Sequence, residues 1–140
     1  MKSIRVLIVD DVPQVRQGLA IVLTLAAKST RPKIEVVGEA RDGSEAIEQA
    51  RALRPDVIVM DLEMPALNGY EATRRIKAEH PTQRVIILSV HAGPQEQQRA
   101  QEAGADGYVT KDAGYEVLVN AILGGDNSAN ASDSKKGDES

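Results

Sequence analysis

The sequence contains no cysteine, phenylalanine or tryptophan, and it has only three tyrosines among 140 residues. Without cysteine the chain has neither disulfides nor thiolate chemistry, which is typical of a reducing compartment such as the cytoplasm. With so few aromatic rings, the core must be built from aliphatic side chains. We therefore expect an aliphatic, cytoplasmic domain in which the position of each tyrosine carries information.

Long apolar runs and a basic excess are also missing. The longest apolar runs are far below the ~18 residues that cross a membrane, and the N-terminus enters a strand pattern without a signal peptide. The formal net charge is −4, whereas nonspecific nucleic-acid binding needs a basic surface. These absences predict no membrane span and no direct nucleic-acid binding by this chain.

Apolar segments with strand character alternate with segments of helical periodicity along the first 124 residues. The predicted strands are 4–9, 34–37, 57–60, 84–88 and 107–109. The predicted helices are 13–27, 44–53, 69–79, 95–103 and 113–123. This strict alternation predicts an α/β fold, a parallel sheet with helices on both faces.

Local signals place the boundaries of these elements. We expect Ser44 to cap the second helix, Arg54 before Pro55 to end it, and Gly104 to close the fourth helix. The last residues, 125–140, are polar and have no apolar side chain larger than alanine. They are predicted to form a flexible tail or linker after a domain of residues 1–124.

Asp61 stands at the most informative point of the chain. It follows the apolar run 57–60 and precedes a turn that contains Pro65 and Gly69. A short apolar run between turn residues is typical of a strand that is buried on both faces. Ligands bind at the carboxyl edge of open parallel sheets, so we predict that Asp61 is the reactive group.

The other predicted strands bring more polar side chains to the same edge. They supply Asp10 and Asp11 after the first strand, Ser89 after the fourth and Lys111 after the fifth. Three converging carboxylates repel one another unless a cation neutralises them, and their oxygens suit Mg²⁺, with Mn²⁺ as an alternative. Lysine and serine can then contact an anion, and these parts suit phosphoryl transfer to a carboxylate.

In this order and spacing, the motifs resemble the receiver domain of two-component response regulators. The resemblance covers about residues 3–124 and rests on Asp10-Asp11, Met60-Asp61-Leu62-Glu63-Met64-Pro65 with Gly69, Leu88-Ser89 and Gly107-Tyr108-Val109-Thr110-Lys111. It implies a flavodoxin-like (βα)5 fold with strand order 2-1-3-4-5 and a site between the first and third strands.

The resemblance also implies a role for each site residue. Asp61 would accept a phosphoryl group from a histidine kinase or a phosphotransfer protein. Magnesium would be held by Asp61, Asp10, Asp11 and the backbone carbonyl of Glu63. The phosphoryl group would be contacted by Lys111 and Ser89, and switching would involve Ser89 and an inward rotation of Tyr108.

Three further positions are expected to adjust access and dephosphorylation, namely Glu63, Val90 and His91. Asp112 follows the lysine where many receivers have proline, which is most similar to receivers of the NarL/LuxR type. We expect phosphorylation to alter the face formed by helix 95–103, strand 107–109 and helix 113–123. The same face could mediate a homodimer. No turnover of a separate substrate is expected, only self-catalysed phosphorylation and slow autodephosphorylation.

The output has two interpretations. The chain is expected to be the regulatory part of a DNA-binding transcriptional regulator whose effector domain is absent from this sequence. The alternative is a stand-alone receiver that acts by protein contact or in a phosphorelay. A flavodoxin-like FMN carrier is disfavoured because the chain has almost no aromatic rings to pack against a flavin. A magnesium phosphatase is disfavoured because it would place two acids one residue apart on the first strand, whereas Asp10 and Asp11 are adjacent.

Individual residues also have simpler explanations. Asp10 and Asp11 could cap the first helix, Ser89 could be an ordinary loop hydroxyl, Lys111 a solvated lysine, and Tyr108 a core residue. Dinucleotide and P-loop glycine motifs do not occur in the sequence. The prediction therefore depends on the strand-end residues occurring together.

Overall fold

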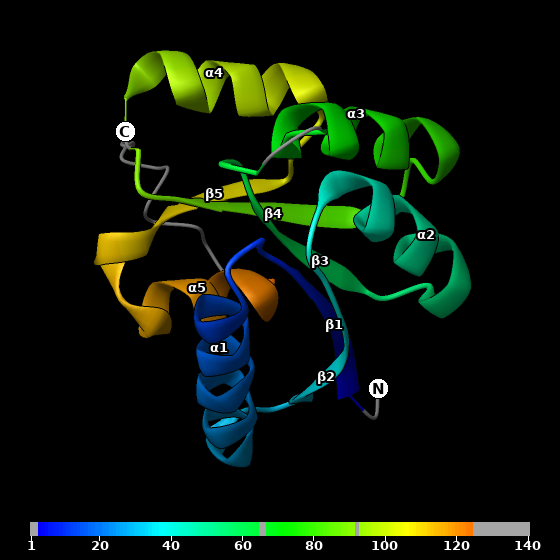
Figure 1. Ribbon diagram of the computed structural model, residues 1–140. Helices are drawn as coiled ribbons and strands as arrows, with labels where there is room; N and C mark the ends of the chain where they lie inside the picture. The colour runs from blue at the N-terminus through cyan, green and yellow to red at the C-terminus, as the bar shows by residue number, and fades with distance from the viewer. Residues whose placement is uncertain (1–2, 65–66, 92, 125–140) are drawn as a thin grey trace.

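The computed structural model describes residues 3–64, 67–91 and 93–124, and it contains one five-stranded parallel sheet (Figure 1). The strand order is β2-β1-β3-β4-β5, which confirms the predicted flavodoxin-like topology. The strands are β1 Ser3–Val9, β2 Lys33–Ala40, β3 Val57–Asp61, β4 Arg84–Ser89 and β5 Gly107–Thr110. All five residues of β3 are buried, as expected for the central strand.

The helices cover both faces of this sheet (Figure 1). They are α1 Pro13–Ala26, α2 Gly43–Leu53, α3 Gly69–Glu79, α4 Pro94–Ala103 and α5 Tyr115–Ile122, with short 3₁₀ turns at Ala27–Ser29 and Lys111–Ala113. One core, of aliphatic side chains with Tyr70 and Tyr108, lies between the sheet and α2, α3 and α4. The other core is wholly aliphatic and lies between the sheet and α1 and α5. None of these helices is long and apolar enough to span a bilayer.

Two helix starts differ from the sequence prediction. The N-cap of α2 is Asp42 rather than Ser44, because the Asp42 carboxylate accepts the backbone N–H of Glu45 at 2.8 Å. A carboxylate at this position also interacts favourably with the helix dipole. Helix α5 begins at Tyr115 rather than Ala113, since Gly114 has φ 97° and separates it from the preceding 3₁₀ turn.

The predicted ends of α2 and α4 are confirmed by backbone geometry. Arg54 lies in the left-handed region with φ 50° directly before Pro55, and Gly104 closes α4 with φ 100°. The structure also extends β2 to Ala40, three residues beyond the predicted end at Val37. Residues 125–140, the predicted tail, and Pro65 in the predicted turn lie outside the described residues.

Gly69 connects the fold to the site. Helix α3 starts at Gly69 with the Asn68 side chain as its cap. A Cβ on Gly69 would overlap the backbone carbonyl oxygen of Asp61. The start of α3 can therefore lie against the end of β3 only because this residue is glycine, which adds a packing reason to the predicted turn.

Candidate functional site

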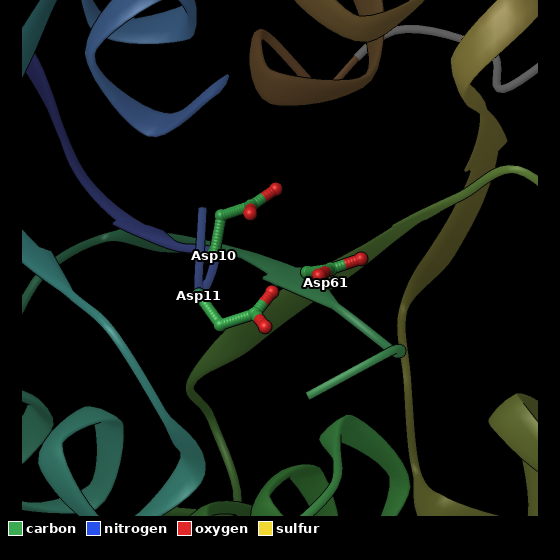
Figure 2. A group of neighbouring side chains, drawn as sticks. All are labelled: Asp10, Asp11 and Asp61. Atoms are coloured by element: carbon green, nitrogen blue, oxygen red, sulfur yellow. The ribbon is translucent and has the colours of Figure 1, made fainter. Parts of the chain in front are cut away.

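Three aspartates meet at the carboxyl ends of β1 and β3. Carboxylate oxygens of Asp10, Asp11 and Asp61 lie within 4.8 Å of one another, and Figure 2 shows the three side chains as neighbours. The two strands are neighbours with Val9 paired to Met60, so the residues after them reach the same edge. Asp10 and Asp61 are only 3% and 4% exposed, whereas Asp11 is partly exposed.

Asp10 is held firmly by its surroundings. Its backbone N–H donates to the carbonyl of Ala40 at 3.0 Å, and its Oδ1 accepts the N–H of Val12 at 2.9 Å. The N-cap residue of α1 is Val12, without a side-chain cap. The two aspartates therefore precede the helix instead of capping it, and Asp10 has its second oxygen directed to another partner.

That partner is Lys111, which follows β5. Its Nζ lies 3.5 Å from Asp10 Oδ2 and 3.4 Å from Asp61 Oδ1. Burial disfavours the ammonium charge, but the negative charges of Asp61 and Asp10 outweigh it and raise the pKa of Lys111 above its usual value. The lysine is thus a permanent cation between two buried acids, not a solvated surface residue.

The electrostatic surroundings of Asp61 disfavour its charge. Burial, followed by the negative charge of Asp10, raises the pKa of Asp61 from 3.8 to about 6, although Lys111 opposes this shift. Its buried Oδ1 has no hydrogen-bond partner in the described part of the chain. Its polar contact among the described residues is therefore the ion pair with Lys111, and a cation or a phosphoryl group could supply further partners.

The donor set fits a hard divalent cation. It offers carboxylate oxygens from three residues, which is the ligand chemistry that Mg²⁺ and Mn²⁺ accept. The same cation would offset both the lost hydration of the buried acids and their mutual repulsion. The structure therefore contains the residues that the predicted metal site requires.

Ser89 and Glu63 form a second group beside the aspartates. Ser89 is completely buried at the end of β4, and its Oγ donates to a Glu63 carboxylate oxygen at 3.1 Å. The same Oγ accepts the backbone N–H of His91 at 3.1 Å. The hydroxyl is therefore engaged with Glu63, a contact that sequence reasoning missed because the two residues are 26 positions apart.

Tyr108 lies inside the fold in this structure. Its side chain is buried, and its hydroxyl donates to the backbone carbonyl of His91 at 2.6 Å. The His91 ring nitrogen Nε2 lies 3.6 Å from a Glu63 carboxylate oxygen. Val90, by contrast, is 62% exposed. Of the three positions predicted to adjust access, Glu63 and His91 therefore lie next to each other, whereas Val90 faces solvent.

The fold and the acid-lysine site define a class of signalling protein. The response regulator receiver domain matches residues 6–123, and the chain belongs to this family, which serves two-component systems.

Similar proteins include response regulators, one of them of the LuxR family. The chain is 41% identical over 119 residues to the response regulator GacA of Pseudomonas viridiflava, a match to 85% of this chain and 53% of GacA. A LuxR-family response regulator from Aurantimonas sp. SI85-9A1 superposes with a TM-score of 0.75 at 36% identity, covering 88% of this chain and 87% of that chain.

A third similar structure is that of a signal receiver domain. The NarL signal receiver domain from Mycobacterium tuberculosis gives a TM-score of 0.79 at 31% identity, covering 89% of this chain and 96% of that chain. The chain spans about half the length of the curated relatives it matches first. These relatives support the predicted similarity to receivers of the NarL/LuxR type.

Proposed function

We propose that Asp61 accepts a phosphoryl group from the phosphohistidine of a histidine kinase or phosphotransfer protein. A carboxylate oxygen of Asp61 forms the new bond to phosphorus, and the imidazole leaves with the electron pair of the broken P–N bond. The observation that carries this proposal is the buried Oδ1 of Asp61, whose neighbouring charge is the Lys111 ammonium at 3.4 Å. That atom is a carboxylate oxygen with a cation beside it, which is what attack on a phosphoryl group requires.

The surrounding residues divide the remaining tasks. Asp10, Asp11, the Asp61 carboxylate and the Glu63 backbone carbonyl would hold Mg²⁺, which supplies positive charge against the developing negative charge on the phosphoryl oxygens. Lys111 keeps its position near Asp61 and exchanges its interaction with the free carboxylate for one with the phosphoryl group. Phosphoryl transfer of this kind depends mainly on positioning and charge.

The switch would connect the phosphoryl group with a protein surface. Ser89 would move toward the new anion, and Tyr108, already buried, would then be stabilised in its inward position. The affected surface is the face of α4, β5 and α5, where the exposed side of α4 is polar. Only Ala100 and Ala103 of α4 are buried, so this helix has little apolar contact to resist a shift.

The output that fits the relatives best is control of transcription through a DNA-binding domain. The LuxR-family similarity supports it, and dimerisation through the α4-β5-α5 face would bring two such domains together. A stand-alone receiver that acts by protein contact or in a phosphorelay is the alternative. The two alternatives are separated by testing whether a protein that joins this chain to a DNA-binding domain binds DNA only when it is phosphorylated. A stand-alone receiver would have no such activity.

The phosphoacceptor role is tested with a small phosphodonor and Mg²⁺, followed by intact mass spectrometry. The parent protein should gain one phosphoryl group, and Asp61→Asn should gain none. Asp112→Asn, an exposed acid close in sequence to Lys111, serves as the control and should behave as the parent does. An unmodified parent, or equal labelling of Asp61→Asn, would contradict the proposal.

A further inference from the structure

The hydroxyl of Ser89 can donate one hydrogen bond, and in this structure it donates to the Glu63 carboxylate. The donor–acceptor distance is 3.1 Å, and the acceptor is a carboxylate oxygen on a side chain that is 42% exposed. A hydroxyl that donates to Glu63 cannot donate at the same time to an anion on Asp61. The two acceptors therefore compete for the same proton.

Both acceptors are reached from the same strand end. Strand β4 pairs with β3, with Leu88 opposite Asp61, so Ser89 is the next residue along the edge. Glu63 follows Asp61 by two positions in the loop after β3. Ser89 thus stands between an acceptor that is present in the resting protein and one that appears only after phosphorylation.

The Glu63 side chain also lies near His91. The Nε2 atom of His91 lies 3.6 Å from the carboxylate oxygen that accepts from Ser89. The His91 backbone is tied in turn to the switch residues, since its N–H donates to Ser89 Oγ and its carbonyl accepts from Tyr108. If Ser89 changes its acceptor, the hydrogen bond from the His91 backbone to Ser89 Oγ is affected. His91 lies three residues before Pro94, the first residue of α4.

We propose that Glu63 is a positioning residue whose side chain retains Ser89 in the resting arrangement, so that binding of a phosphoryl group at Asp61 must displace this contact. The inference rests on the proposed function of Asp61. It assigns to the Glu63 side chain a role separate from that of its backbone carbonyl, because every substitution at this position leaves the carbonyl in place. The contact opposes phosphoryl engagement and favours the unphosphorylated state.

A double-mutant cycle tests this inference. The four proteins are the parent, Glu63→Ala, Ser89→Ala and the double variant, and the probe is beryllofluoride with Mg²⁺ as a phosphoryl analogue. Affinity is measured by titration with amide NMR, which also shows that each variant is folded. The cycle is needed because removing the negative charge of Glu63 strengthens binding of an anion even without the contact.

With Ser89 present, Glu63→Ala should bind beryllofluoride about 5-fold to 10-fold more tightly, because the serine no longer leaves a charged acceptor. In the Ser89→Ala background the same substitution should have an effect at least about 3-fold smaller, since only the charge effect remains. Equal effects in the two backgrounds would overturn the inference. A parent that binds no beryllofluoride would instead count against the proposed function of Asp61.

Discussion

Replacing Asp61 by asparagine should stabilise the metal-free protein at neutral and alkaline pH. The folded state raises the pKa of this carboxyl from 3.8 to about 6, first through burial and second through Asp10. The folded protein therefore binds the proton more tightly than the unfolded chain, and the free energy of unfolding falls as the pH rises from about 4 to about 6. Ionising Asp61 costs about 3 kcal/mol at pH 8, from about two pKa units at ~1.4 kcal/mol each.

Asparagine does not ionise and so removes this cost. The stability that Asp61→Asn gains over the parent must therefore depend on pH. We expect Asp61→Asn to raise the free energy of unfolding by about 2 to 3 kcal/mol at pH 8, and by roughly half as much at pH 5. Part of the gain is lost because Lys111 keeps only one of its two acidic neighbours.

The assay is urea denaturation in a chelator at several pH values. Glu48→Gln is the control, since Glu48 is an exposed acid on α2 and its change should stay within about 0.5 kcal/mol. A less stable Asp61→Asn protein at pH 8, or a gain that is equal at pH 5 and pH 8, would refute the electrostatic reasoning.

Four other outcomes follow from the site and its supports. Mg²⁺ at about 100 times its dissociation constant should raise the free energy of unfolding of the parent by about 2.7 kcal/mol and that of Asp61→Asn by less, measured by thermal unfolding. Lys111→Met should destabilise the metal-free protein at pH 8 by about 1 to 3 kcal/mol and less at pH 4, because ionised acids lose their counter-charge; equal losses would contradict this. Gly69→Ala should cost about 1 to 3 kcal/mol through its clash with the Asp61 carbonyl, whereas Gly18→Ala, with open space in α1, should gain about 0.5 to 1 kcal/mol by urea denaturation. Val90→Ala should shorten the phosphoryl lifetime in a time course of phosphoprotein loss, because a smaller exposed side chain admits water and phosphatases; an unchanged lifetime would reject that role.

The main elements could be predicted because their residue patterns are local. Each predicted strand overlaps an observed one, and the central strand was placed from an apolar run that ends at Asp61. The acid-lysine site was predictable for a related reason, since parallel strands present their carboxyl ends at one edge. The strand order itself came from the family resemblance rather than from periodicity.

Two features could not be predicted. One depends on two residues that can both cap a helix, and the other depends on a contact between residues far apart in the sequence. Asp42 and Ser44 are both good helix caps, and only the backbone geometry decides in favour of Asp42. The direction of the Glu63 side chain depends on packing between two loops, so no pattern within one segment indicates its contact with Ser89. Such side-chain directions become visible only when the strands are placed side by side.

The most direct test of the central claim is to locate the phosphoryl group on the chain. The protein is phosphorylated with a small phosphodonor and Mg²⁺, and the acyl phosphate is reduced with borohydride, which converts a phosphorylated aspartate to homoserine. Peptide mass spectrometry should then find homoserine at position 61, with Asp10 and Asp11 unchanged. Conversion at another aspartate, or no conversion in a protein that has gained a phosphoryl group, would contradict the assignment of Asp61.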